Sequence, residues 1–250
     1  MAGVLVLAGS LTGCPTEPEA PPASTTTTTT TTTTPPCVAA YIKAVTPGSL
    51  PATGWWSSDT RSQGAVYVDS TYGAPAGFGC NAVILETRDN TQINGTYQDK
   101  AQLFNYSEAG TPLGTVTELS YWAYRSSASS SVNTAINVAM NVQVAGSTVP
   151  GNFATLVYEP YNQSGGNAGI VPDTWQQWDT LATSPGDGEW WTTKIGSGPG
   201  SQGDPQPWSF FVDLYTDGQV VGYGYNLGSN NPNTITAADG VTFNSTTTDF

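Results

Sequence analysis

The stretch Thr134–Val144, TAINVAMNVQV, alternates strictly between two kinds of side chain. Its large apolar residues are Ile136, Val138, Met140, Val142 and Val144, and the small or polar residues between them are Ala135, Asn137, Ala139, Asn141 and Gln143. A strand points successive side chains to opposite faces, whereas a helix repeats every 3.6 residues. The stretch therefore predicts a β-strand with one face in a core and a polar face turned outward.

Short stretches of strand character, separated by turns, fill the rest of the chain from residue 37. They are Val38–Ala44, Trp55–Trp56, Ala65–Asp69, Cys80–Thr87, Asp99–Tyr106, Thr115–Arg125, Phe153–Glu159, Thr174–Leu181, Glu189–Ile195, Gln219–Leu227 and Val241–Phe250. Glycine (28) and proline (18) are abundant, which favours turns, and Pro207–Tyr215 is the one stretch predicted as a short helix. We predict an all-β fold: a single jelly-roll-like β-sandwich over residues 37–250, with at most one short helix.

The stretch Asp173–Trp191 holds four of the eight tryptophans of the chain. We predict two neighbouring strands here, joined by a loop rich in proline, glycine and aspartate. Trp175 and Trp178 are separated by an odd number of positions, as are Trp190 and Trp191, so each pair is expected to point to opposite faces. One member of each pair would fill the core, and the other would be capped by a loop or contact a partner.

Charge and composition exclude several functional classes. The net charge is −13, and so acidic a chain repels the phosphate backbone of nucleic acids. The chain has no histidine, which excludes Ser-His-Asp and Cys-His catalysis and histidine-ligated zinc or haem. Carboxylate pairs, tyrosine or lysine general acids and oxygen-ligated calcium remain.

The first fourteen residues, MAGVLVLAGSLTGC, contain an apolar run that ends at Leu11-Thr12-Gly13-Cys14. This resembles the lipobox of bacterial lipoproteins, which implies cleavage before Cys14 and attachment of a lipid to its thiol. The run departs from a signal peptide in having no preceding lysine or arginine. An ordinary cleaved signal with an incidental cysteine is the alternative.

Residues 15–36 are mostly Pro, Glu, Ala, Ser and an unbroken run of ten threonines, Thr25–Thr34. Such a tract has nothing to bury and predicts a disordered tether. Together with a lipid on Cys14, it would present the domain in the bacterial cell envelope, facing the outside or the periplasm. In an exported protein the two remaining cysteines, Cys37 and Cys80, are expected to form a disulfide.

Several segments in order resemble a widespread group of bacterial secreted or surface jelly-roll domains. The segments are GFGCNAVILET, DKAQLFNYSEAGTPLGTVTELSYWAYR, FATLVYEPYN, TWQQWDTL with EWW, VVGYGYNLGS and ADGVTFNSTTTDF, over about residues 77–250. The group has no settled biochemical activity, so the resemblance implies a fold and a location and assigns no mechanism.

The candidate binding residues are aromatic rings and amides, which stack on and hydrogen-bond to sugars. They are Trp175, Trp178, Trp190, Trp191, Gln177 and Asn141, with Gln176, Asn137 and Gln143 beside them. They would form one platform if the two polar strand faces lie in one sheet. The alternative is that these tryptophans pack the core and the loops.

Acidic residues give two further candidates. A glycosidase needs a carboxyl pair, and the acids near the tryptophans or within strands are Glu118, Glu159, Asp179, Asp187 and Glu189. A structural calcium, the one metal considered, would use loop oxygens from Asp89, Asn90, Asp99, Asp173, Asp187 and Asp239. Neither set has a diagnostic spacing, and no cofactor is expected.

The sequence thus favours a non-catalytic module, anchored at the cell surface, that binds an extracellular glycan or other polymer. The first alternative is a structural or adhesive module whose aromatics are all internal and which contacts surface proteins. The second is a carbohydrate-active enzyme that uses carboxylates.

Overall fold

The computed structural model describes residues 54–88, 92–130 and 137–250. The chain divides into two units, Met1–Pro36 and Cys37–Phe250, and the fold described below belongs to the second. Several predictions fall outside the described residues: the lipobox with Cys14, the tether 15–36, the strand Val38–Ala44, Cys37, and the calcium candidates Asp89 and Asn90. These stay predictions.

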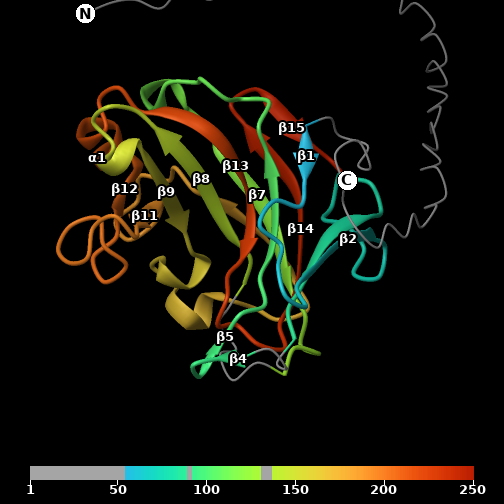
Figure 1. The fold of residues 1–250 in the computed structure, drawn as a ribbon. Coiled ribbons are helices and arrows are strands. Elements are labelled where there is room, and N and C mark those ends of the chain that lie inside the picture. Colours follow the sequence, from blue (N-terminus) through green and yellow to red (C-terminus); the bar gives the residue numbers. More distant parts are fainter. Residues whose placement is uncertain (1–53, 89–91, 131–136) are drawn as a thin grey trace, which may run out of the picture. The chain divides into compact units, whose positions relative to one another are not determined.

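Two antiparallel sheets form the body of the domain (Figure 1). The larger sheet has seven strands in the order β1 (Trp55–Trp56), β6 (Ala101–Asn105), β13 (Gln219–Leu227), β8 (Ala139–Ala145), β9 (Phe153–Tyr158), β11 (Glu189–Thr192) and β12 (Gln206–Pro207). The smaller sheet runs β10 (Trp175–Asp179), β7 (Leu119–Arg125), β14 (Ile235–Phe243), β3 (Ala82–Glu86) and β2 (Ala65–Asp69), and β15 (Thr246–Thr248) pairs with β14. The chain crosses repeatedly between the sheets, as it does in a jelly roll.

Few elements lie outside these sheets. A small hairpin joins β4 (Gln92–Ile93) to β5 (Thr96–Tyr97), and the helix α1 spans Trp208–Leu214. Four 3₁₀ turns complete the described elements: η1 (Leu113–Thr115), η2 (Pro150–Asn152), η3 (Pro160–Asn162) and η4 (Gly166–Gly169). The predicted all-β sandwich is therefore confirmed, and so is the short helix after Pro207.

The core lies between the inner faces of the two sheets. Alternate residues of β9 (Ala154, Leu156 and Tyr158) and of β7 (Leu119, Tyr121 and Ala123) are buried there. The predicted alternation of β8 is also confirmed: Met140, Val142 and Val144 enter the core, and the residues between them face outward.

Some boundaries differ from the sequence prediction. The strand β14 begins at Ile235 rather than Val241, because the chain already pairs with β3 and β7 before Gly240 and continues to pair with β7 after it. The hairpin β4–β5 was missed, although its turn residues Asn94 and Gly95 carry the strongest short-range hairpin signal. Both residues have positive φ angles, 53° and 78°.

The prediction of a tryptophan-rich hairpin was wrong. β10 is the edge strand of the six-stranded sheet and pairs with β7, whereas β11 belongs to the seven-stranded sheet and pairs with β9 and β12. The predicted orientations nevertheless hold, because Trp190 is buried in the core while Trp191 is only half-buried on the outer face. The Trp190 indole Nε1 donates to the Thr180 carbonyl at 2.7 Å, which links the ends of the two strands across the sandwich.

Cys80 is disulfide-bonded, as predicted, and its predicted partner Cys37 lies outside the described residues. Among the residues that the structure describes, no helix has the length and apolar character needed to span a membrane.

Candidate functional site

The outer face of the seven-stranded sheet carries the residues of the candidate site. The strand register places Gly224 beside Asn141, Asn141 beside Val157, and Val157 beside Trp191. A second row places Asn226 beside Ala139. This face is therefore floored by small or amide side chains and carries a tryptophan at one end.

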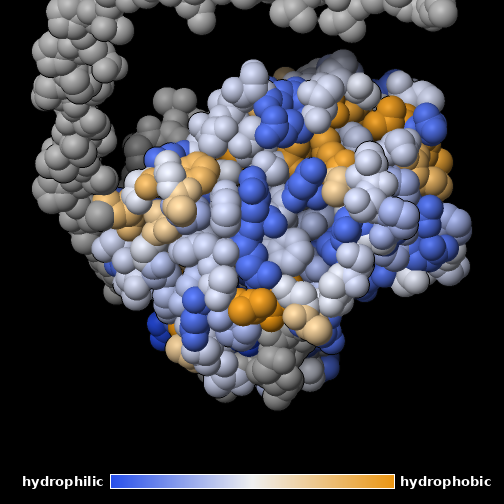
Figure 2. Space-filling view, turned by 180° about the vertical axis from the view of Figure 1, so that it is seen from behind, coloured by the Kyte–Doolittle hydropathy of each residue, from blue (hydrophilic) through white to orange (hydrophobic). Residues whose placement is uncertain are grey.

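A cavity of about 400 Å³, which we call the groove, lies over this face. Its lining comes from four strands, β8, β9, β11 and β13, and from loop residues next to the strands of this sheet. The lining residues are Arg61, Lys100, Asn137, Ala139, Val157, Glu159, Tyr161, Trp191, Gln202, Asn226, Leu227, Gly228, Ser229, Asn230 and Asn231. Hydrophilic residues also gather across the middle of the molecular face shown in Figure 2, with hydrophobic residues in smaller patches.

Glu159 organises one end of the groove. Its Oε2 accepts hydrogen bonds from the Tyr161 hydroxyl at 2.8 Å and the Trp191 Nε1 at 2.9 Å. The side-chain amides of Asn162 (3.2 Å) and Gln202 (3.5 Å) donate to the same oxygen. Every one of these bonds ends on Oε2, so the carboxyl holds two aromatic rings and two side-chain amides around itself.

Local sequence explains how these groups come together. Pro160 cannot continue the ladder of β9 and opens the turn η3, which returns Tyr161 toward Glu159. Gln163, which is 5% exposed, then ties the two strands together: its Nε2 donates to the carbonyls of Glu159 (3.0 Å) and Glu189 (3.2 Å). Its Oε1 accepts from the Glu189 N–H at 3.0 Å. Gln163 thus holds the backbone that carries the cluster.

Burial raises the pKa of the Glu159 carboxyl above its ordinary value. Hydrogen bonds from Tyr161, Trp191 and Gln202 oppose this shift because they favour the ionised form. Burial and the Glu159 charge also raise the pKa of the Tyr161 hydroxyl. A carboxyl with a raised pKa, facing a cavity among aromatic rings, is typical of a functional site.

Amide groups at the floor keep hydrogen-bonding atoms without a protein partner. Asn137 is 4% exposed and lines the groove; its Oδ1 accepts from the Val138 N–H, but its Nδ2 has no partner among the described residues. The Oδ1 atoms of Asn141 and Asn226 are also buried without a partner. Buried polar groups are normally paired. Asn137 and Asn226 line the groove, so a turn of either amide toward the cavity would offer an unpaired atom to a ligand or water.

Comparisons with known proteins identify no family for this chain. No family model and no curated protein matches it. Among solved structures, an arabinose-bound GH51 α-L-arabinofuranosidase matches 76% of this chain at 10% sequence identity and a TM-score of 0.36. The chain spans 22% of the length of that enzyme, and a match this weak carries no argument about function.

The structure divides the six predicted binding residues between two sheets. Trp191 and Asn141 share the outer face of the seven-stranded sheet. Gln177 lies on β10 in the other sheet, so the predicted single platform is wrong. The other three tryptophans lie elsewhere: Trp190 is fully buried, Trp178 packs against the core, and Trp175 packs on the outer face of the six-stranded sheet.

The predicted acids do not gather into a pair at the groove. Of the described residues that line it, Glu159 is the one acidic side chain. Burial raises the pKa of Glu189, on the adjacent strand, and the charges of Asp187 and Asp204 add to that shift. Glu118 and Asp179 are exposed away from the groove lining.

The calcium candidates are also dispersed. In the described ranges, no three acidic or cysteine side chains lie close enough together to hold a metal ion. Each described candidate instead accepts backbone N–H groups: Asp99 from Gln63, Asp173 from Ser127, Asp187 from Ser164, and Asp239 from Gly240. A structural calcium stays a prediction.

Sequence reasoning missed Tyr161, Gln202, Asn226, Arg61 and Lys100 as groove residues. A signal for Asn226 was present, because Gly222, Gly224 and Asn226 alternate with large apolar residues along β13 and mark a small, polar outer face. Gln202 lies in the long loop after β11, and local patterning does not tell where such a loop folds.

Proposed function

We propose that this chain is a non-catalytic module that binds an extracellular glycan in the groove. The observation that carries the proposal is the cluster of Trp191, Tyr161 and Glu159 beside a floor of unpartnered amides. Aromatic faces stack on the C–H faces of sugars, while carboxyl and amide groups bind the hydroxyls. The cavity of about 400 Å³ has the size of a small-ligand site.

The charge arrangement favours binding over hydrolysis. Glycosidases of the common two-carboxyl type need a second acid about 5–10 Å from the first. Glu159 has no acidic neighbour in the described lining of the groove. Its Oε2 is occupied by four donors, which suits a positioning role better than proton transfer.

The test compares two tryptophans that the sequence alone does not distinguish. Intrinsic fluorescence of the full chain would be titrated with a panel of neutral and acidic polysaccharides. We expect Trp191→Ala to weaken binding at least about tenfold, since stacking and the bond to Glu159 are both lost. The matched control Trp175→Ala, on the other sheet, should bind like the unaltered protein. Equal losses in both variants, or no binding by the unaltered chain, would contradict the proposal.

An enzyme is the second candidate, and the raised pKa of Glu159 favours it. Release of reducing ends from the same polysaccharides measures that activity directly. If the chain hydrolyses one of them and Glu159→Gln stops the reaction, the module is catalytic and our proposal is wrong. We expect no release above the rate of the variant.

For location, we propose a lipid anchor on Cys14 in a bacterial cell envelope, with residues 15–36 as a tether. The proposal rests on the sequence Leu11-Thr12-Gly13-Cys14 and on the threonine run that follows. Replacing the cysteine, Cys14→Ser, should move the protein from the membrane fraction to the soluble fraction of expressing cells. Unchanged membrane partitioning would contradict the anchor and leave the binding proposal untouched.

A further inference from the structure

Basic side chains meet at the end of the groove farthest from Trp191. The chain has six basic residues against nineteen acidic ones, yet two of the six, Arg61 and Lys100, line the groove. Their backbones form an antiparallel bridge, with the Arg61 N–H donating to the Lys100 carbonyl at 3.0 Å. Arg88 does not line the groove, and Arg125 is 2% exposed at the end of β7. Two of the six basic side chains of a strongly acidic chain therefore meet at one end of the groove.

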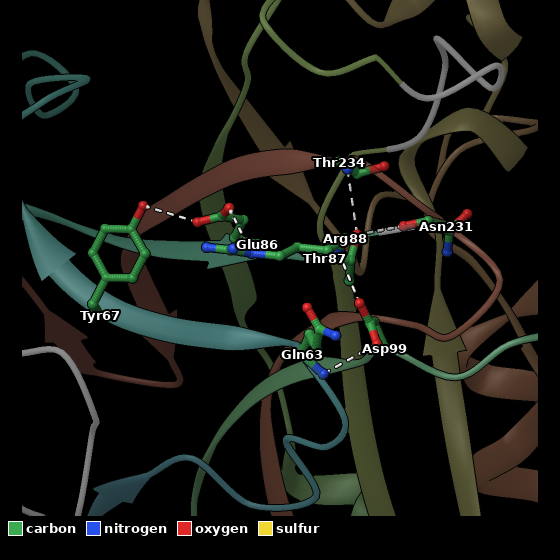
Figure 3. Close-up of polar contacts among 8 residues, drawn as sticks. All are labelled: Gln63, Tyr67, Glu86, Thr87, Arg88, Asp99, Asn231 and Thr234. Atoms are coloured by element: carbon green, nitrogen blue, oxygen red, sulfur yellow. Dashed lines mark hydrogen bonds and ion pairs between the residues drawn. The ribbon is translucent and has the colours of Figure 1, made fainter. Parts of the chain in front are cut away.

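Asp99 fixes this end of the groove (Figure 3). Its carboxylate is 1% exposed and accepts the backbone N–H of Gln63 and of Arg88, each at 3.0 Å. It therefore joins the loop that carries Arg61, the end of β3, and the residue before Lys100. The cationic groups stand on backbone that is already held in place before any ligand arrives.

A second set of bonds holds the loop on the other side of the basic pair. The Thr87 hydroxyl donates to the Asn231 carbonyl and accepts from the Thr234 N–H at 3.3 Å, as Figure 3 also shows. The Thr87 N–H donates to the Thr234 carbonyl at 3.0 Å. Asn230 and Asn231, which line the groove, are thereby placed beside Arg61 and Lys100.

Asp59 neutralises only part of this charge. It forms ion pairs with the Lys100 Nζ at 2.6 Å and with the Arg61 Nη1 at 3.5 Å. With Asp99 beside Lys100, two acids balance the formal charge of the two bases, so the unused donors of the bases, rather than a net charge, make this end suitable for an anion. An ammonium has three donors and a guanidinium has five, so most of the donors of the pair are not used by Asp59.

We propose that the Arg61–Lys100 end of the groove is a subsite for a negatively charged group of the glycan. The ligand of this module is then an acidic polysaccharide, with uronic acid carboxylates or sulfate esters. This inference rests on the proposed function, because it names the class of glycan that the same groove takes. Guanidinium groups bind carboxylate and sulfate oxygens in pairs, which suits Arg61 to either anion.

The two ends of the groove contact different sugar units. Lys100 immediately precedes β6, Glu159 immediately follows β9, and β13 and β8 lie between these strands. Three strand steps of about 4.8 Å separate the ends by about 14 Å. That distance exceeds a single sugar ring, so one unit would stack on Trp191 while a later unit places its anion at Lys100.

The test uses one oligosaccharide in two charge states. Calorimetry with the full chain at pH 7 would compare oligogalacturonides as free acids with the same oligomers fully methyl-esterified. We expect the free acids to bind about tenfold more tightly, as a charge-assisted hydrogen bond would give. Sulfated and desulfated forms of one galactan form a parallel arm, which distinguishes sulfate from carboxylate as the preferred anion.

Single substitutions test which side chains produce the preference for the charged oligosaccharide. Arg61→Gln and Lys100→Gln should each reduce the preference for the charged form to about threefold or less, because one of two cations is lost. Arg88→Gln is the matched control: its side chain lies outside the groove lining, and its backbone N–H to Asp99 is unaffected. It should keep the full preference.

The outcomes separate this inference from the proposed function. If charged and uncharged forms bind equally and Trp191→Ala still abolishes binding, the groove binds glycans and the anion subsite is wrong. If Arg88→Gln loses the preference for the charged oligosaccharide as fully as Lys100→Gln, that preference arises from the overall charge of the protein. The anion subsite is then also wrong. If no oligosaccharide in either arm binds, the anion subsite is wrong; the proposed function fails as well only if no polysaccharide of the neutral and acidic panel binds.

Discussion

The outer faces of the two sheets both carry aromatic side chains, but these pack against one another on one face and border a cavity on the other. On the six-stranded sheet, Tyr124, Tyr72 and Trp175 pack together, with the Trp175 Nε1 donating to the Tyr72 carbonyl at 3.1 Å. The Tyr124 hydroxyl donates to Asp173 at 3.1 Å. On the seven-stranded sheet, Trp191 borders an open groove whose floor contains unpartnered amides.

The difference between the faces arises from what covers them. The turn after β2 brings Tyr72 over the six-stranded sheet, so its aromatic rings bury the small cluster of Ala82, Ile84 and Ala237. The loop after β9 folds back only as far as Glu159 and leaves Ala139 and Asn137 lining a cavity. An outward tryptophan therefore marks a functional surface only where the chain itself leaves the neighbouring face uncovered.

The largest expected loss of stability distinguishes the two adjacent tryptophans of β11. Trp190 is fully buried against Tyr158 and Trp208, and its Nε1 donates to Thr180. Trp190→Ala should lower the free energy of unfolding by about 3–5 kcal/mol, the usual cost of a large core cavity. Trp191→Ala should lower it by about 1 kcal/mol, since that ring is half-buried. Urea denaturation measures both, and equal losses would mean that the groove is part of the core.

Much of the fold could be predicted from period-two patterning. The strands Ala65–Asp69 and Gln219–Leu227 match their predicted bounds, and the outward face of β8 was identified from Asn141 and Gln143. The opposite orientations of Trp190 and Trp191 also follow from the pattern alone. Alternation reports which way a side chain points relative to its own strand.

Alternation does not report which sheet a strand joins. For this reason the predicted binding platform, which needed β10 and β11 in one sheet, was wrong. Nine residues lie between Asp179 and Glu189, and that loop crosses from one sheet to the other. Partner choice depends on long-range pairing with β7 and β9. The groove also needs Tyr161, Gln202 and Lys100 from separate segments, and no local spacing relates them.

Asp239 is a carboxyl sealed from solvent, whereas Glu159 lines the groove. Asp239 in β14 is 0% exposed; its Oδ1 accepts from the N–H of Gly240 and of Phe250, and its Oδ2 has no partner in the part of the chain that the structure describes. Burial raises the pKa of this carboxyl to about 7, and the Asp249 charge adds to the shift. The folded chain therefore holds a proton near pH 5–6 that the unfolded chain has released, and its stability falls as pH rises from about 4 to 7.

We expect that fall to reach roughly 4 kcal/mol, since three pKa units at about 1.4 kcal/mol each separate the two states. Asp239→Asn should match the unaltered protein at pH 4 and exceed its free energy of unfolding at pH 8, because the amide never ionises. Urea denaturation over this pH range measures the slope. A variant with the same slope as the unaltered chain would assign the pH dependence to other carboxyls.

A smaller loss of stability is expected from a substitution at Gly240, where β14 contacts the rings of Phe78 and Trp122. Gly240 has a φ of 55°, and an added Cβ would lie 2.6 Å from the Phe78 ring and 2.9 Å from the Trp122 ring. Gly240→Ala should therefore lower the free energy of unfolding by about 2 kcal/mol through overpacking and backbone strain. Gly196→Ala, with no atom within 4 Å of the new Cβ, should change it by less than about 0.5 kcal/mol. Equal stabilities would show that Phe78 moves aside freely.

The smallest expected effect belongs to the open carboxyl. Glu159→Gln keeps the shape of the side chain and removes a charge that burial already disfavours, so the free energy of unfolding should change by less than about 1 kcal/mol. Glycan affinity should fall about fivefold, because a sugar hydroxyl loses a charged acceptor.

The raised pKa of Glu159 also predicts how glycan affinity changes with pH. With a neutral or sulfated glycan, which does not itself titrate, acidification protonates the carboxyl, so the affinity of the unaltered chain should decline toward that of the variant, whose own affinity stays constant. If both proteins lose affinity in parallel as pH falls, Glu159 does not contact the ligand, and the face with the open groove differs from the covered face in shape alone.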